Sequence, residues 1–562
     1  MGVPLMEKSP TVMWARIRIA EIFAVTVFLL LSLMLAGHAQ AKPSSKNSKK
    51  DARPNIVFVQ ADDAIVTDIP YMPNVRRVLQ RGGTSFGNNI APYPLCGPAR
   101  ASLLTGQLAH NNDLLSNFRS NEGGYLKFKE QPGKLNQRNS LGPWLHQAGY
   151  RTGMVGKYLN EYGAESHTDV PPGWDRWAAL LDNSTYDYFN YAINVDGKVQ
   201  YHGDKDYADA QLNFAHMGAT DTPTSFAELL ASAHAAFDPY DYFGTQDEKQ
   251  YSMDITGDIA SKFVKKSAPS KKPFFLYYAP PGPHAEDTNH FQGLRPGAPD
   301  PDPRPPVRYA HTFDNISLPQ TPSFNEADVT DKAENLKNTP LLTEGQIATM
   351  TDSYRGRLGA LRSVDDQVGK IIKDLKKAGE YRNTYFIFNS DNGYMQGQHR
   401  LRSSKFLPYE YSARIPALIS GPGIRKGQTI TRQSMDVDMT PTVLDMANAR
   451  PGRRMDGVSL LPAAEGKKKL PARDIPLEAI RPLFLFTTPI TAFDLPYYGV
   501  RTSRYKYIHW SFSGTNIELY DLKTDPDELK NLAADPAYSS LVDKLEAKAS
   551  SLRTCRGTAQ CR

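Results

Sequence analysis

Short apolar runs recur along the chain, and segments with helical spacing lie between them. The run "NIVFVQ" (Asn55–Gln60) is rich in β-branched and aromatic residues, as expected for a buried strand. Apolar residues from Leu358 to Leu375 recur in steps of three and four, which predicts an amphipathic helix that ends at Gly379. This alternation predicts an α/β fold with a large, mainly parallel sheet flanked by helices. Further runs of strand character are "RTGMV", "PFFLYYA", "TYFIFN" and "RIPALIS".

Polar side chains stand just after four of these predicted strands. Because the carboxyl ends of parallel strands meet at one edge of a sheet, we expect these side chains to converge. Taken singly, an Asp-Asp pair is typical of a turn or a helix cap, and "DNG" is typical of a tight turn. Taken together, three carboxylates and an amide oxygen suit a hard cation, Ca²⁺ or Mg²⁺. The residues in question are Asp62, Asp63, Lys157, His284, Asp391 and Asn392.

Cys96 begins the segment "CGPARASLLTG", which predicts a helix with Pro98 in its first turn. A helix N-terminus favours anionic groups, so a nucleophile at this position would be stabilised as an anion. Arg100 lies about one turn further on and can hold an oxyanion or an anionic substrate. The alternative is a buried, unreactive thiol.

The N-terminus has the pattern of a secretory signal at residues 1–41, with the apolar run Ile22–Ala36 and the small-residue sequence "AQA". An uncleaved membrane anchor is the alternative, although the apolar run is short for a span of roughly 20 residues. Residues 42–53 follow as a basic, flexible leader. This leader holds five of the basic residues behind the net charge of +6, so no nucleic-acid partner is indicated.

The sequence divides into a main domain, residues 54–472, and a small C-terminal α+β domain, residues 473–562. Cys555 and Cys561 are close enough in the tail to form a disulfide that fastens the C-terminus, since disulfides persist in exported proteins. Residues 202–250 form an insert without clear periodicity. The tyrosine-rich segment Asn183–Gly203 suits either sugar binding or core packing.

The order of these motifs strongly resembles the type I sulfatases, whose fold is the alkaline-phosphatase/sulfatase-like sandwich. The resemblance rests on Asp62-Asp63, "CGPAR", "GKYLNEY", "PH", "SDNGY" and Lys405. The finer matches "VPPGW" and "SVDDQVGKI" are similar to N-acetylglucosamine-6-sulfatases and extracellular heparan endosulfatases. This sequence departs from the commonest family pattern at Gly97 and Ala99, and Lys157 lacks the histidine that follows it in many arylsulfatases.

The resemblance implies that Cys96 is oxidised to formylglycine by a formylglycine-generating enzyme. A hydroxyl of the hydrated aldehyde attacks sulfur, and its second hydroxyl allows sulfate to be expelled afterwards. The expected catalytic residues are Cys96, Arg100, Lys157, His284 and Lys405. The expected ligands of Ca²⁺, or of Mg²⁺, are Asp62, Asp63, Cys96, Asp391 and Asn392.

The implied substrate is a sulfated carbohydrate, of the 6-sulfated N-acetylglucosamine type, or an aryl sulfate ester. The implied location is secreted, periplasmic or otherwise extracytoplasmic, and lysosomal in a eukaryote; the membrane is a partner only if the signal is uncleaved. One alternative is a phosphonate or phosphate-ester hydrolase of the same superfamily. Another is a secreted glycan-binding protein without turnover, which would be expected to lack metal ligands or the nucleophile.

Overall fold

The computed structural model describes residues 1–2, 51–119, 122–130, 136–206, 208–209, 212, 247–286, 303–334, 336–481, 495–511 and 516–562. Apart from residues 1–2, the predicted signal lies outside the described residues, and so do residues 42–50 of the leader and most of the 202–250 insert. Signal cleavage and the role of the insert therefore stay predictions. Residues 51–562 form one compact unit.

The core of this unit is a sheet that has ten strands among the described residues. Five adjacent strands (β9, β1, β8, β4 and β5) run parallel. β10 and β6, which flank this block, run antiparallel to their neighbours. The predicted large, mainly parallel sheet is therefore confirmed. In sheet order the strands are β11 (Gln428–Ile430), β2 (Thr84–Phe86), β10 (Ala417–Ser420), β9 (Thr384–Ser390), β1 (Asn55–Ala61), β8 (Phe274–Ala279), β4 (Arg151–Gly156), β5 (Arg176–Leu180), β6 (Tyr191–Val195) and β7 (Lys198–His202).

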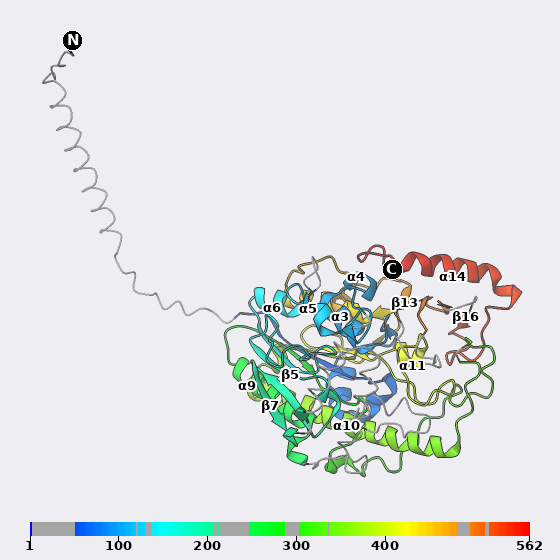
Figure 1. Ribbon diagram of the computed structural model, residues 1–562, viewed down its shortest axis with the longest axis horizontal. Helices are drawn as coiled ribbons and strands as arrows, with labels where there is room; N and C mark the ends of the chain where they lie inside the picture. The colour runs from blue at the N-terminus through cyan, green and yellow to red at the C-terminus, as the bar shows by residue number, and fades with distance from the viewer. Residues whose placement is uncertain are drawn as a thin grey trace. The chain divides into compact units, whose positions relative to one another are not determined.

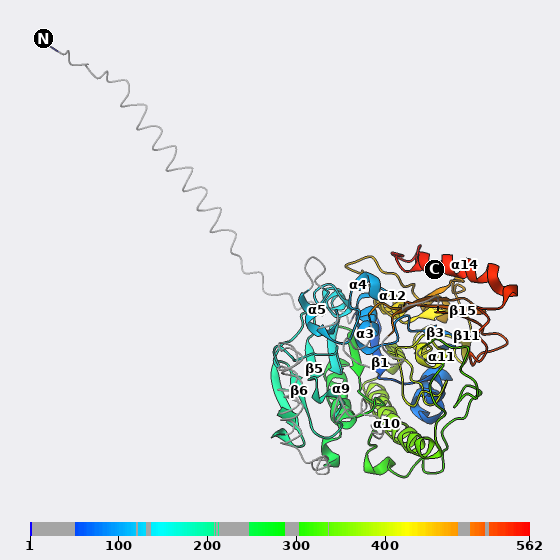
Figure 2. The same ribbon diagram turned by 45° about the vertical axis from the view of Figure 1, so that its right-hand side comes forward.

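Helices cover both faces of the sheet, and β1 shows why the strand is apolar throughout. Ile56 and Phe58 pack into a core with α3, α6 and α12, whereas Val57 and Val59 pack into a second core with α9 and α10. Figures 1 and 2 show α3 and α10 on opposite sides of the sheet. A strand buried on both faces needs an unbroken apolar run. These helices are α3 (Cys96–Thr105), α6 (Leu141–Gln147), α9 (Ser252–Ser267), α10 (Glu344–Lys377) and α12 (Met439–Ala447).

The helix predicted from residues 358 to 375 is the C-terminal part of α10, which is longer than predicted. It begins with a capping box in which Thr343 accepts from the Gln346 amide and the Gln346 side chain accepts from the Thr343 amide. The helix ends just before Gly379, whose φ of +74° suits the glycine.

The C-terminal region forms a separate antiparallel sheet with a helix packed on it, in line with the predicted α+β composition. Helix α14 (Ser539–Leu552) packs on this sheet and is drawn in red in Figure 1. The predicted disulfide joins Cys555 and Cys561. A domain boundary at 473 stays a prediction. The strands are β13 (Ile475–Ala479), β14 (Tyr497–Arg501), β15 (Tyr505–Trp510) and β16 (Asn516–Asp521).

The remaining elements are short. Within the described ranges, no helix is long and apolar enough to cross a membrane. These elements include α2 (Pro73–Val75), α4 (Ala109–Asn112), α5 (Gly124–Glu130), α11 (Glu410–Ala413), α13 (Leu461–Ala464) and a small sheet of β3 (Asn89–Ile90) and β12 (Ser434–Met435).

Candidate active site

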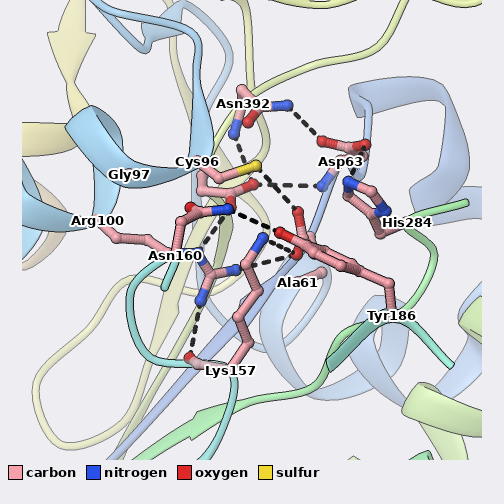
Figure 3. A network of polar contacts seen from close by, with 12 residues as sticks. Ala61, Asp63, Cys96, Gly97, Arg100, Lys157, Asn160, Tyr186, His284 and Asn392 are labelled. Atoms are coloured by element: carbon pink, nitrogen blue, oxygen red, sulfur yellow. Dashed lines mark hydrogen bonds and ion pairs between the residues drawn. The ribbon is translucent and has the colours of Figure 1, made fainter. Parts of the chain in front are cut away.

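The side chains predicted to converge do meet at the carboxyl ends of the parallel strands (Figure 3). Asp62 and Asp63 follow β1, Lys157 follows β4, and the loop that carries His284 follows β8. Every acidic residue of the set is at least 99% buried. The set brought together is Asp62, Asp63, Cys96, Arg100, Lys157, His284, Asp391, Asn392 and Lys405.

The acidic part of the site is built from β1 and β9. The Asn392 amide nitrogen donates to Asp63 Oδ1 over 2.6 Å, and its amide oxygen has no hydrogen-bond partner among the described residues. Asp391 Oδ1 accepts from the backbone amides of Asp63, at 3.2 Å, and of Asn392, at 2.9 Å. These bonds lock the two strand ends together.

Three cations face these carboxylates. Arg100 Nε lies 2.8 Å from Asp391 Oδ2, and its Nη1 donates to the Lys157 carbonyl over 2.9 Å. Lys157 Nζ donates to Asp62, and Lys405 Nζ donates to Asp63 Oδ1 over 2.7 Å. Burial raises the pKa of Asp62, but the charges of Lys157, His284 and Arg100 outweigh it and lower that pKa to about 2.

Cys96 is the first residue of α3 and is fully buried. Its Sγ lies 3.1 Å from Lys405 Nζ and 3.7 Å from Asp62 Oδ1. Stabilisation of an anion by the helix N-terminus stays a prediction. Burial raises the pKa of Cys96 to about 12, and the nearby Lys157 and Lys405 lower it only in part. An unmodified Cys96 is therefore a poor nucleophile at neutral pH.

His284 lies at the more open side of the site, with its side chain 15% exposed. Its Nε2 lies 3.7 Å from Asp63 Oδ2, and its Nδ1 lies 2.6 Å from the Ala285 carbonyl. Burial and the charge of Lys405 lower the pKa of His284. Lys405 is similarly open, with 17% of its side chain exposed, whereas Lys157 is 2% exposed.

The donor set fits a hard divalent cation. Asp62, Asp63, Cys96 and His284 each bring one ligand atom to within 4.8 Å of the others. The amide oxygen of Asn392 has no hydrogen-bond partner among the described residues. Turning the amide by half a turn, which changes its shape little, would point this oxygen toward Asp63 as a further oxygen ligand. Carboxylate and amide oxygens are the ligands that Ca²⁺ and Mg²⁺ prefer.

Three buried residues at the site were missed by the sequence analysis. Arg357 of α10 donates to the Asp63 carbonyl over 2.8 Å. Tyr186 stacks near His284, with ring centres 4.2 Å apart, and its hydroxyl accepts from Asn160 over 2.9 Å. A signal for Asn160 was present, because this residue belongs to the family motif "GKYLNEY". Arg357 and Tyr186 had no such signal, because neither follows a predicted strand.

Gly97 and Ala99, which differ from the commonest family pattern, both lie in the buried first turn of α3. The Gly97 amide donates to Asn117 Oδ1 over 2.7 Å, and a Cβ on Gly97 would lie only 2.9 Å from that oxygen. Any larger residue here would need Asn117 to move. Ala99 is 1% exposed, in the tightly packed first turn of α3.

The tyrosines early in the Asn183–Gly203 segment are buried, which favours packing over a sugar-binding surface. Tyr186, Tyr188 and Tyr191 are each no more than 3% exposed. Tyr191 stacks on His202, with ring centres 5.1 Å apart. Of these three tyrosines, Tyr186 contacts the side chains of Lys157 and His284, and Tyr188 donates to the His284 backbone carbonyl.

Two family models match the chain. The Sulfatase model matches residues 54–449, and the model of the N-sulphoglucosamine sulphohydrolase C-terminal region matches residues 397–555. The chain is 29% identical over 539 residues to the N-acetylglucosamine-6-sulfatase of Homo sapiens, covering 90% of this chain and 85% of that one. It is 32% identical over 420 residues to the extracellular sulfatase SULF-1 homolog of Drosophila melanogaster, a match that spans 74% of this chain but 32% of that relative. The match to the related Caenorhabditis elegans protein likewise spans 50% of that protein's length.

Solved structures share the fold. A protein in complex with its substrate D-glucosamine-2-N,6-O-disulfate superposes with a TM-score of 0.63 at 23% identity, covering 89% of this chain and 97% of that one. The phosphonate monoester hydrolase of Agrobacterium radiobacter superposes with a TM-score of 0.59 at 20% identity, covering 89% and 95%. At these identities the likeness concerns the architecture alone.

Proposed function

This chain belongs to the sulfatase family, and on that premise we propose that it hydrolyses sulfate esters of sugars through a formylglycine made from Cys96 and one divalent cation. The observation that carries the proposal is the setting of Cys96. Its Sγ lies within 4 Å of both Lys405 Nζ and Asp62 Oδ1, inside a cluster of buried acids and cations. An unmodified Cys96 thiol, whose pKa is raised by burial, would be a poor nucleophile at this position.

Asp62, Asp63, residue 96, Asp391 and Asn392 are the residues that would hold the cation, Ca²⁺ or Mg²⁺. Asp62, Asp63 and Cys96 belong to the cluster of grouped donor atoms, and Asp391 Oδ1 accepts from the Asp63 and Asn392 amides beside it. A hydrated formylglycine at residue 96 would supply one hydroxyl to attack sulfur and a second through which sulfate is released and the aldehyde restored, and the cation would stabilise negative charge. Side chains of the protein neutralise the sulfate oxygens and protonate the leaving alcohol.

Arg100, Lys157 and Lys405 neutralise the sulfate oxygens as charge develops on them. Arg100 and Lys157 are buried and hydrogen-bonded, so they need little rearrangement during the reaction. Their positive charge also favours binding of the dianionic product, and the neighbouring carboxylates limit that affinity.

His284 and Lys405 are the candidates to protonate the leaving alcohol. Their side chains are 15% and 17% exposed, whereas those of Arg100 and Lys157 are 0% and 2% exposed. We infer that the sugar approaches from this more open side, which brings the leaving oxygen next to His284 and Lys405.

The proposed substrate is a 6-sulfated N-acetylglucosamine unit, and an aryl sulfate is the simplest alternative substrate. Support comes from the relatives named N-acetylglucosamine-6-sulfatase, one of which covers 90% of this chain. The proposed maturation partner is a formylglycine-generating enzyme. The proposed location is outside the cytoplasm, since some relatives are named extracellular sulfatases. The phosphonate and phosphate esters remain the competing substrate class.

Mass spectrometry of the peptide that carries Cys96 tests the modification. Material from the native host should contain an aldehyde or its hydrate at residue 96, and Cys96→Ala should fold with its thermal midpoint preserved but without turnover. Only free thiol in active enzyme would contradict the proposed mechanism.

A comparison of kcat/KM tests the substrate. The panel is 6-sulfated N-acetylglucosamine, 4-sulfated N-acetylgalactosamine, an aryl sulfate and an aryl phosphonate. We expect the 6-sulfated sugar to be preferred. A preference for the aryl sulfate over both sugars would refute the glycan assignment alone, and a preference for the phosphonate would refute the sulfatase assignment.

A further inference from the structure

Tyr186 contacts two of the proposed catalytic side chains. Lys157 Nζ lies over the Tyr186 ring at 4.7 Å from its centre. The imidazole of His284 lies on the same tyrosine, with ring centres 4.2 Å apart and an angle of 32° between the planes. Figure 3 shows the tyrosine reaching into the site beside His284, with its hydroxyl near Lys157. One aromatic ring therefore touches both an ammonium and an imidazole.

The tyrosine is itself held firmly. It is 3% exposed and ends a short helical turn, Ser184–Tyr186, between β5 and β6. Ser184 Oγ donates to the Leu181 carbonyl over 2.8 Å and accepts from the Ala192 amide over 3.0 Å. The Tyr186 hydroxyl accepts from Asn160 Nδ2 over 2.9 Å. These bonds fix the ring before any substrate arrives.

The same segment also fixes the backbone of His284. Tyr188 donates from its hydroxyl to the His284 carbonyl over 2.5 Å, and its amide donates to Glu286 Oε1 over 2.8 Å. The contact between His284 Nδ1 and the Ala285 carbonyl, at 2.6 Å, leaves Nε2 directed toward the acidic cluster. The backbone and the ring plane of the imidazole are thus fixed, and the contact with Tyr186 fixes the ring plane.

We propose that Tyr186 is a positioning residue that holds Lys157 and His284 in their working geometry at the sulfate ester. This inference rests on the proposed function. The ring face attracts the ammonium of Lys157, which keeps its Nζ at the sulfate position without a second carboxylate that would repel the substrate. The stacked imidazole keeps Nε2 within reach of the leaving oxygen. Small displacements of such groups cost rate more than binding, since they act in the transition state.

Three substitutions of Tyr186 separate positioning from packing. Tyr186→Leu removes the ring, so kcat should fall by at least about tenfold while KM changes by less than about threefold. Tyr186→Phe keeps the ring face and should retain kcat within about threefold. Pentafluorophenylalanine at position 186 keeps the shape but reverses the charge distribution of the ring, so kcat should fall at least about threefold below the Phe variant.

Inhibition by inorganic sulfate gives a second readout that a merely structural role would not move. A displaced Lys157 holds sulfate less well, so the inhibition constant should rise in the Leu and pentafluorophenylalanine variants and stay near the wild-type value in the Phe variant. Tyr162→Leu is the matched control, because Tyr162 is a fully buried tyrosine that packs on Trp177, and its hydrogen bonds and ring contacts within the described part of the chain involve none of the site residues named above. It should lower the thermal midpoint without changing kcat or sulfate inhibition.

The outcomes are distinct. Folded Tyr186→Leu with wild-type kcat and sulfate inhibition overturns the inference and leaves the proposed function standing. If Tyr186→Leu does not fold, equal kcat and inhibition constants in the Phe and pentafluorophenylalanine variants overturn it instead. A kcat loss of the same size in Tyr162→Leu also overturns it. Wild-type enzyme that hydrolyses no sulfate ester overturns both the inference and the proposed function.

Discussion

Asp391 joins two parts of the site through its two carboxylate oxygens. Oδ2 lies 2.8 Å from Arg100 Nε, and Oδ1 accepts from the backbone amides of Asp63 and Asn392. One side chain therefore orients both the guanidinium that we propose binds the sulfate and the strand ends that carry the proposed oxygen ligands. Both partners are buried, so neither can turn to water if Asp391 is lost.

We expect Asp391→Asn to abolish turnover and to weaken Ca²⁺ or Mg²⁺ binding by more than about 100-fold, because it removes a charged ligand and releases Arg100. It should also destabilise the fold by about 3–5 kcal/mol, since a buried charge loses its partner. Calorimetric metal titration and thermal unfolding measure the two effects.

The matched control is Asp365→Asn. Asp365 of α10 is a fully buried carboxylate that accepts from the backbone amides of Asn74 and Val75 in α2. The Asp365→Asn substitution should lower the free energy of unfolding and leave metal affinity unchanged. Equal metal affinity in Asp391→Asn and the wild type would remove Asp391 from the ligand set.

At the scale of elements, α10 does more than cover the sheet. Arg357 projects from its buried face, 2% exposed, and donates to the carbonyls of Asp63, at 2.8 Å, and Pro283, at 3.2 Å. Its guanidinium also lies 4.4 Å from the ring centre of Tyr394. The helix thereby ties together the chain segments that follow β1, β8 and β9.

Arg357→Met should leave two buried carbonyl groups without a donor, at a cost of about 1–3 kcal/mol each. Because Asp63 would be less firmly held, metal affinity should fall by about 10–100-fold. Lys373→Met changes an exposed cation of the same helix and should alter neither quantity. Thermal unfolding and metal titration of both variants check this, and an Arg357→Met protein with wild-type metal affinity would rule out the positioning role.

At the scale of the whole chain, polar and charged contacts fasten the C-terminal sheet and tail to α4 and to Asp456. His110 of α4 lies 2.6 Å from Glu478 of β13, and its Nε2 lies 2.9 Å from the carbonyl of Cys555. Nearby, the Gly557 amide donates to Asp456 Oδ1 over 2.6 Å. The C-terminal tail is thus docked on the part of the chain that follows α3.

The contact of His110 should make stability depend on pH. Burial lowers the pKa of His110, but Glu478 and the Cys555 carbonyl outweigh it and raise that pKa to about 9. The folded pKa lies above the unfolded value of about 6.5, so this stabilisation is complete below pH 6.5 and disappears as the pH rises through 9. Its size is on the order of 2–3 kcal/mol.

Thermal unfolding of the wild type and His110→Gln between pH 6 and 9.5 measures this contribution. The difference in midpoint should be largest at the acid end and should shrink as the pH rises. A difference that stays constant over this range would show that His110 is not charged in the folded protein.

The Cys555–Cys561 disulfide closes a short loop, with a sequence separation of 6. A loop of this size restricts the unfolded chain little, so the double variant Cys555→Ser and Cys561→Ser should lose about 2 kcal/mol at most. Activity should be unchanged, because the tail does not reach the site residues. A non-reducing peptide map tests the disulfide, and thermal unfolding of the double variant tests its contribution to stability. A folded double variant without activity would contradict the expectation that activity is unchanged.

The sequence by itself determined five strands of the main sheet (β1, β4, β8, β9 and β10), the helix that begins at Cys96, the C-terminal part of α10 and the side chains that converge. Local pattern is enough for this, because strands buried on both faces, such as Asn55–Ala61, need continuous apolar runs. The rule that parallel strands present their carboxyl ends together then brings Asp62, Asp391 and His284 to one place. The family resemblance supplied Lys405, which follows no strand.

Only the tertiary structure decided which charges pair and which helix or loop residues reach the site. Arg357 belongs to an amphipathic helix, where an arginine is usually solvated, yet it is buried because three strand ends offer it carbonyls and a ring. Tyr186 lies in a turn whose local pattern does not distinguish a site wall from ordinary packing. Local pattern could not give the pKa of the Cys96 thiol either, since burial by distant segments is its largest contribution.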